Sequence, residues 1–402
     1  MTIVISWENI TDRLKILKID SNHSAAFSTV TQRIFTTYTT DSTTETSSDI
    51  YLPKPEYTNL LGREKEIENI KEVLSETRRG KIIGVDGFGG IGKTALVQEI
   101  IKSHSDVGFD KVIWQTASTR DDSEKMTFAT VLDAIATQLN RLDLFKLKRE
   151  EIEIKIRELL QEQPVLIVLD NMETSDEPQN EIIQKLLPIL GSSKALLTSR
   201  HRFTETFGDN LFPIHLRGFN KEAAINLMEE TATHKNMLRD FKAVKDNQLE
   251  QMIQVTGDES FGYTPMALKF ILGQLQKFDP EVIVEGLEGV RLTDENGEIS
   301  DKDEFKQFWK HIFLTSFKLL SYLDRKFMSG MTLFEPSIGS KYNEIMSTIR
   351  LSNEEFRLVV DSTWKVSFLE IGQIDSRKTY YLHRLSYTFF FAIISQFSKR
   401  RI

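Results

Sequence analysis

Eight residues near position 90 have the types and spacing of a phosphate-binding loop. The segment Gly87-Phe-Gly-Gly-Ile-Gly-Lys-Thr94 matches the pattern G-x-x-x-x-G-K-[ST] at every fixed position. Its glycines let successive backbone N–H groups point into one concavity, and the helix expected after it adds a positive dipole end. Lys93 would then reach the β- and γ-phosphates of ATP or ADP, and the Thr94 hydroxyl would ligate Mg²⁺. The nucleotide-binding residues predicted in the loop are Gly87, Gly89, Gly90, Ile91, Gly92, Lys93, Thr94 and Ala95.

An apolar run followed by an aspartate predicts the part of this site that holds Mg²⁺. The run from Pro164 to Leu169 reads as a buried strand, and Asp170 follows it. At the carboxyl edge of a sheet, Asp170 would hold the Mg²⁺ water shell beside Thr94. Taken alone, the run is equally typical of a buried strand with a turn-forming Asp. Asn171 stands where many nucleotide hydrolases have a second acid, and Glu173 is out of register, so we expect weak ATPase activity at most.

A third chemical element follows another strand, in the segment "ALLTSRHRF". Thr198, Ser199 and Arg200 would face the γ-phosphate from the edge of the sheet, and arginine suits a forked contact with phosphate. A plain strand end followed by a basic loop has the same appearance. We predict Lys93, Asp170 and Arg200 as the catalytic group.

The elements that must position these residues alternate along the chain. Strands are predicted at Lys81–Val85, Val112–Thr116, Val165–Leu169, Ala195–Thr198 and Pro213–Leu216, and helices over 64–77, 94–104, 126–140, 148–161 and 180–189. This alternation predicts an α/β fold, a P-loop parallel sheet with helices on both faces. Further helices are predicted over 220–232, 246–254 and 265–276, followed by a helical region with the hairpin "VSFLEIGQIDSRKTYYLHRL", which is the order of a winged-helix domain. The aromatic run Tyr387–Phe391 is predicted to be helix core.

Composition limits the class of protein. The 402 residues include no cysteine, which excludes a disulfide framework and a thiolate metal site and fits a cytoplasmic location. Neither a signal peptide nor a membrane span is expected. More than half of residues 31–50 are Ser or Thr, which predicts a linker after a short N-terminal arm with one helix over residues 7–18. The net charge is −8 overall but +5 over residues 301–402, which permits an anionic partner there.

At this point the motifs resemble, in their order, the NB-ARC class of STAND ATPases. The segment "LLGREKEI" resembles the family's hhGRxxE motif, which implies that Leu61, Gly62 and Arg63 contact the adenosine. "FDKVIWQTAS" and "IHLRGFNKEAAINLM" resemble the segments that precede the Asp strand and that end the nucleotide domain.

Two further segments resemble the parts of this family that close over the nucleotide. "GYTPMAL" resembles the GxP motif, which implies that Pro265 begins a lid helix. "YYLHRL" resembles the winged-helix MHD motif, which implies that His383 senses the β-phosphate of ADP. Arg384 stands where the family has an Asp.

The resemblance implies a bacterial-type regulator related to apoptosome and plant resistance switches. We expect an N-terminal arm and linker (1–56), a nucleotide domain (57–217), a helical lid (218–300) and a winged helix (301–402). ADP would favour a closed monomer, and ATP would release a self-associating surface, with an effector or sensor protein acting in trans. Two alternatives remain open: a DNA-binding ATPase of the replication-initiator or transcription-regulator kind, and a scaffold that binds nucleotide without hydrolysing it.

Overall fold

The computed structural model describes most of the chain from Leu60 onward. The described residues are 60–76, 80–102, 104–117, 125–203, 205–290, 292, 302–336, 339–374 and 377–398. The predicted helix over 7–18 and the Ser/Thr-rich linker lie outside these residues. Within these ranges, the search for a helix of sufficient length and apolarity to cross a membrane finds none.

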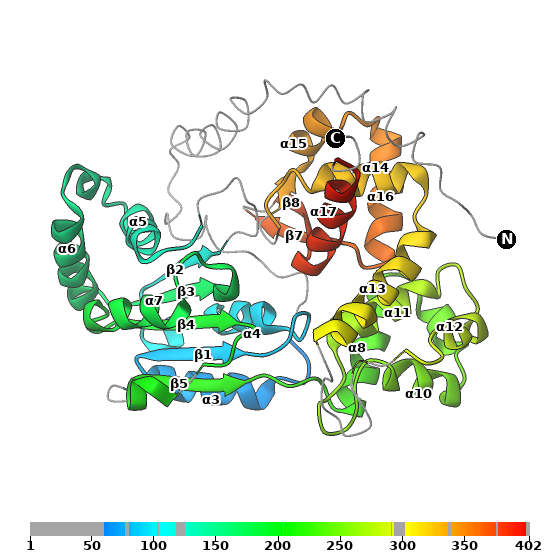
Figure 1. The fold of residues 1–402 in the computed structure, drawn as a ribbon, viewed down its shortest axis with the longest axis horizontal. Coiled ribbons are helices and arrows are strands. Elements are labelled where there is room, and N and C mark those ends of the chain that lie inside the picture. The colour runs from blue at the N-terminus through cyan, green and yellow to red at the C-terminus, as the bar shows by residue number, and fades with distance from the viewer. Residues whose placement is uncertain are drawn as a thin grey trace. The chain divides into compact units, whose positions relative to one another are not determined.

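A five-stranded parallel sheet forms the first part of the described chain (Figure 1). Its strands are β1 (Ile82–Asp86), β2 (Lys111–Thr116), β3 (Val165–Asp170), β4 (Lys194–Ser199) and β5 (Leu211–His215), in the spatial order β2-β3-β4-β1-β5. All five predicted strands are present, each within two residues of its predicted bounds. The predicted parallel α/β sheet is confirmed.

Helices cover both faces of this sheet. They are α3 (Glu64–Ser75), α4 (Lys93–Ile101), α5 (Phe128–Gln138), α6 (Arg149–Glu162) and α7 (Gln179–Leu186), with short 3-10 turns at His104–Val107, Leu142–Lys146, Met172–Thr174, Leu187–Ile189 and Glu205–Asn210. Neighbouring strand residues point to opposite faces: Ile82 packs with α5, α6 and α7, whereas Ile83 packs with α3 and α4. Because both faces are covered, all six residues of β3 are buried.

Two helix boundaries differ from the sequence prediction for local reasons. Helix α5 begins at Phe128 and not at 126, because the side chain of Thr127 accepts a hydrogen bond from the backbone N–H of Thr130 and caps the helix. The helix predicted over 180–189 ends as an α-helix at Leu186, and Pro188, which has no N–H to continue it, lies in a 3-10 turn.

A helical segment follows the sheet. It comprises α8 (Lys221–His234), α9 (Leu238–Lys242), α10 (Asp246–Gln254), α11 (Pro265–Gln274) and α12 (Pro280–Gly286). The sequence prediction included α8, α10 and α11 and missed the short α9 and α12. As predicted, Pro265 begins α11, where its missing N–H does not matter.

The C-terminal part has the element order of a winged helix. After α13 (Lys302–Leu319) come α14 (Tyr322–Met331), β6 (Ser340–Lys341), α15 (Tyr342–Ile349), α16 (Asn353–Lys365), β7 (Leu369–Ile374), β8 (Arg377–Leu382) and α17 (Arg384–Ser398). The antiparallel hairpin of β7 and β8 is the one predicted from the sequence, and β6 joins it on the far side of β8. In the aromatic run of α17, Tyr387 and Phe390 are buried as predicted, whereas Phe391 is exposed.

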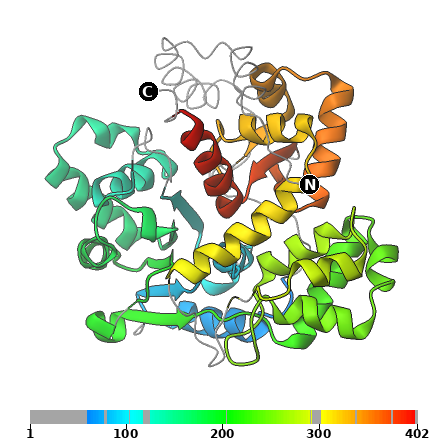
Figure 2. The same ribbon diagram turned by 45° about the vertical axis from the view of Figure 1, so that its right-hand side comes forward.

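Everything after the sheet shares one hydrophobic core. A single cluster of buried side chains extends from Phe219 to Phe390, and α13 packs directly on α11. Figure 2 shows α13 in yellow, beside the green lid helices and the red α17. The lid and the C-terminal helices are therefore packed as one unit, which fixes the position of α17 relative to α11.

Candidate nucleotide site

The phosphate loop has the backbone conformation that its glycines permit. Strand β1 ends at Asp86 and α4 begins at Lys93. Between them Gly87, Gly90 and Gly92 have φ angles of 149°, 82° and 103°, a region that side chains with a Cβ rarely enter. The loop therefore joins a buried strand to a helix N-terminus, as the sequence predicts for an anion-binding site.

The Lys93 side chain lies inside this loop. Its Nζ donates to the carbonyl oxygens of Gly87 at 2.7 Å and Phe88 at 2.9 Å. The side chain is buried, and burial lowers the pKa of Lys93 to about 8, despite an opposing effect of Glu173. A buried ammonium without an ion pair among the described residues is suited to an anionic ligand.

Thr94 and Asp170 meet as the sequence predicts. The Thr94 hydroxyl donates to Asp170 Oδ1 at 2.9 Å, and the Thr198 hydroxyl donates to the same oxygen at 2.6 Å. These are oxygen donors of the kind that Mg²⁺ prefers. No cluster of three or more His, Asp or Glu side chains suited to a metal occurs in the described ranges. The arrangement therefore fits a magnesium ion held through one carboxylate, one hydroxyl and the phosphates of a nucleotide, and not a cage of protein ligands.

Arg200 is paired with an acid that the sequence analysis left without a role. Its Nε lies 2.9 Å from Glu173 Oε1, and its backbone N–H donates to Glu173 Oε2 at 3.1 Å. A Cβ on Gly89 would lie 3.3 Å from Arg200 Cζ, so the guanidinium packs against the phosphate loop. Asn171 has a left-handed backbone, and its side-chain amide donates to the hydroxyl of Thr174. The pairing of Glu173 with Arg200 could not be read from their spacing.

Arg63 also contacts the phosphate loop. Its Nη2 donates to the carbonyl of Ile91 at 3.0 Å, and its guanidinium lies 4.6 Å from the centre of the Phe219 ring. The side chain is buried. Leu61 and Gly62 form the turn before it, and a Cβ on Gly62 would collide with Ala223. Arg63 thus links the start of the nucleotide domain to the phosphate loop and to the first lid residues.

Later parts of the chain cover the phosphate loop. The backbone N–H of Met266, in the first turn of α11, donates to the carbonyl of Gly90 at 3.2 Å. A Cβ on Gly90 would lie 2.8 Å from Met266 Cβ, 3.2 Å from Leu385 Cδ1 and 3.3 Å from Trp309 Cη2. Three elements, α11, α13 and α17, therefore contact a single glycine of the loop.

His383 lies immediately before α17, the helix whose Leu385 contacts the phosphate loop. Its Nδ1 accepts a hydrogen bond from the Leu385 backbone N–H at 3.2 Å, so the neutral ring carries its proton on Nε2. Burial lowers the pKa of His383 to about 4, and the nearby charges of Arg200 and Arg384 act in the same direction. The ring is therefore neutral at pH 7 and offers Nε2–H as a donor.

The structure adds Arg384 to the surroundings of the site. Its Nη2 donates to the carbonyl of Ala117 at 2.5 Å, next to the end of β2. The side chain is only 7% exposed, and its Nε and Nη1 have no hydrogen-bond partner among the described residues. This placement could not be predicted from the sequence, in which Arg384 only stands where the resemblance expects an acid.

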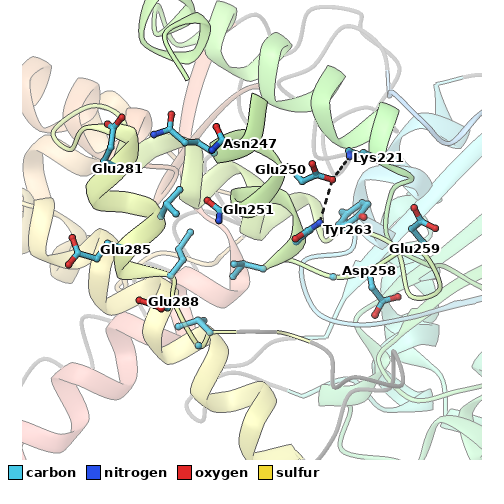
Figure 3. A pocket seen from close by; sticks show the side chains of 18 of the residues that line it. Lys221, Asn247, Glu250, Gln251, Asp258, Glu259, Tyr263, Glu281, Glu285 and Glu288 are labelled. Carbon is cyan, nitrogen blue, oxygen red and sulfur yellow. Dashed lines mark hydrogen bonds and ion pairs between the residues drawn. The ribbon is translucent and has the colours of Figure 1, made fainter. Parts of the chain in front are cut away.

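A large cavity elsewhere in the lid is not the nucleotide site. It has a volume of about 1100 Å³ and lies between α10 and α12 (Figure 3). Its lining includes Glu250, Asp258, Glu259, Glu281, Glu285 and Glu288, whereas Lys221 is paired with Glu250 at 2.6 Å. This acidic lining would repel phosphates, and apart from Lys221 and Tyr263 it lies outside the sequence motifs described above.

Comparison with known proteins agrees with this geometry. The model of the NB-ARC domain matches residues 63–238. The transcription activator GutR of Bacillus subtilis is 25% identical over 233 residues, which cover 54% of this chain and 27% of GutR. The putative disease resistance protein At1g59780 of Arabidopsis thaliana is 30% identical over 152 residues, covering 36% of this chain and 15% of that protein. The chain thus spans about a quarter or less of the length of these two relatives.

Among solved structures, a STAND protein with a tetratricopeptide repeat sensor, PH0952 from Pyrococcus horikoshii, has a similar fold. Its TM-score is 0.53 at 16% identity, over 87% of this chain and 44% of that one. The similarity includes the C-terminal part that the NB-ARC model does not match. Residues 63–238 thus match the NB-ARC domain, and the chain is similar in sequence over this domain to disease resistance proteins and in fold to a STAND protein.

Proposed function

We propose that the chain is a nucleotide-controlled switch, held closed by ADP and released by ATP. The observation that carries this proposal is the contact of α11, α13 and α17 with Gly90, because a change in the phosphates must act on residues that pack there. In the closed state the loop and Lys93 bind the phosphates, Thr94 and Asp170 bind Mg²⁺, and Leu61, Gly62 and Arg63 lie at the adenosine. Bound Mg²⁺ would neutralise phosphate charge.

Several residues support a switch with slow turnover. Glu173 is paired with Arg200, and the Asn171 side chain is bonded to Thr174. Neither arrangement provides a carboxylate at the position after Asp170, where a water-activating base would stand. Hydrolysis would then reset the switch slowly. A nucleotide can shift the conformation only by its difference in affinity for the two states.

The proposal includes the domain boundaries predicted above. The division at 217/218 is supported by the separate hydrophobic clusters on either side of it, which end at Leu216 and begin at Phe219. The division at 300/301 would lie within one packed unit. We further propose a cytoplasmic protein that self-associates in the ATP state and acts with an effector or sensor protein in trans.

DNA binding is less well supported. The helix in the position of a recognition helix, α16, has the sequence NEEFRLVVDSTWK, in which three acids outnumber two bases. Phosphate contacts require a basic surface and would make binding strongly dependent on salt. A DNA titration at two salt concentrations would test this alternative.

Hydrogen exchange tests the proposed switch directly. With ADP, the amide of Met266 should be protected, because it donates to the carbonyl of Gly90 in the closed arrangement. A non-hydrolysable ATP analogue should increase exchange at Met266 and shift the protein to larger species on a sizing column. The Lys93→Ala variant is the control and should respond to neither nucleotide. Identical exchange of the wild-type protein with both nucleotides would overturn the proposal.

A further inference from the structure

The guanidinium of Arg384 lies beside the metal end of the nucleotide site. Its Nη2 donates to the carbonyl of Ala117, and the N–H of Ala117 donates to the carbonyl of Asp170 at 2.9 Å. Asp170 in turn accepts the hydroxyl of Thr94. Arg384 is thus joined through one residue to the acid that would hold Mg²⁺.

The neighbouring residue of α17 confirms that this helix begins at the loop. The Leu385 side chain packs on both Gly89 and Gly90, since a Cβ on either would lie within 3.3 Å of it. The positive end of the 15-residue α17 therefore lies beside the phosphate loop.

The charge of Arg384 lacks a partner among the described residues. The side chain is 7% exposed, only Nη2 has an acceptor, and that acceptor is a neutral carbonyl. An uncompensated buried charge is expensive, and so is each buried N–H without a partner. Two nearby acids, Asp170 and Glu173, act on its charge from a distance, but Asp170 accepts the hydroxyls of Thr94 and Thr198, and Glu173 is paired with Arg200. A bound anion would compensate the charge and give Nη1 an acceptor.

We propose that Arg384 is a phosphate-binding residue that the C-terminal domain contributes to the nucleotide site. Its Nη1 donates to the β-phosphate of ADP, while Nη2 keeps one N–H on the carbonyl of Ala117 and turns its second N–H to the same phosphate. The fork that Nη1 and Nη2 form matches two phosphate oxygens. The contact locks α17 onto the loop, and an acid at this position would repel the phosphate. This inference rests on the proposed switch, because it assigns Arg384 to the closed, ADP-bound state.

The test compares ADP with a non-hydrolysable ATP analogue by calorimetry. Arg384→Met should weaken ADP binding at least tenfold, because two charge-assisted hydrogen bonds are lost. The affinity of this variant for the ATP analogue should fall less than threefold, because α17 leaves the phosphate loop when ATP is bound. Arg384→Lys keeps the positive charge but loses the fork. Its affinity for ADP should lie between that of wild type and that of Arg384→Met. The exposed Arg357 on α16 provides the matched control, and Arg357→Met should change neither affinity.

A purely structural role predicts a different pattern. If Arg384 only anchors α17 to Ala117, Arg384→Met would lower the melting temperature without nucleotide and leave the ADP-to-ATP preference unchanged, which would overturn the inference. A larger loss for the ATP analogue than for ADP would also overturn it. If wild-type protein binds no nucleotide, or if binding is unaffected by Lys93→Ala, the proposed function fails together with this inference. Binding that depends on Lys93 but not on Arg384 refutes the inference alone.

Discussion

His383 should contribute to the destabilisation of this protein by acid. Its pKa is about 4 in the folded chain and 6.5 without the fold. Burial is the main cause; Lys269, Arg200 and Arg384 lower the pKa further, and Glu370 opposes them. Because the folded pKa is below the unfolded one, the unfolded chain binds more protons between these values, and stability falls as pH decreases from 6.5 to 4. At pH 5 the loss should be about 2 kcal/mol, since each unit of pKa difference corresponds to about 1.4 kcal/mol.

Urea unfolding at pH 7.5 and pH 5.0 measures this effect. Acidification also protonates carboxylates, so the quantity to compare is the pH-dependent loss of wild type minus that of His383→Gln. We expect the variant to lose about 2 kcal/mol less than wild type over this interval. His201→Gln, at an exposed position, is the control and should behave like wild type. Equal losses in wild type and His383→Gln would refute the claim that this ring is held neutral by burial.

The other predictions concern the nucleotide. Lys93→Ala should remove most nucleotide affinity and leave the far-UV circular dichroism unchanged, because Lys93 hydrogen-bonds only to loop carbonyls; unchanged affinity in a nucleotide titration would remove the phosphate-loop assignment. Asp170→Asn should abolish the gain in ATP affinity that Mg²⁺ gives, measured by titration with and without EDTA, and a gain that persists would contradict the metal role of Asp170. His383→Ala should weaken ADP binding roughly ten- to hundredfold, the equivalent of one hydrogen bond to a charged group, with a much smaller change for ATP; equal losses in calorimetry would make His383 an ordinary core histidine.

Much of the fold could be predicted from the sequence because the patterns that indicate its elements are local. Apolar β-forming runs identified all five strands, and the fixed spacing of Gly87, Gly92, Lys93 and Thr94 identified the loop. The meeting of Thr94 and Asp170, 76 residues apart, also followed, because parallel strands end at one edge of a sheet. The short helices α9 and α12 were missed, since five and seven residues provide too little helical periodicity.

Contacts between residues far apart in the sequence could not be predicted from single motifs. The family resemblance implied that Arg63 contacts the adenosine. In the structure its side chain donates to the Ile91 carbonyl, a contact that depends on how α3 packs on α4. Arg384 and Ala117 are 267 residues apart, and their contact depends on the shared core of the helices that follow the sheet. The pairing of Arg200 with Glu173 likewise depends on the turn that Asn171 makes after β3.

The nucleotide content of the purified protein tests the central claim most directly. If α11, α13 and α17 close over a bound nucleotide, ADP should dissociate slowly and remain through purification. Denaturing the protein and separating the supernatant on an ion-exchange column should then yield ADP in an amount close to that of the protein, and Lys93→Ala protein should yield almost none. Well-folded wild-type protein that releases no nucleotide would contradict the closed switch.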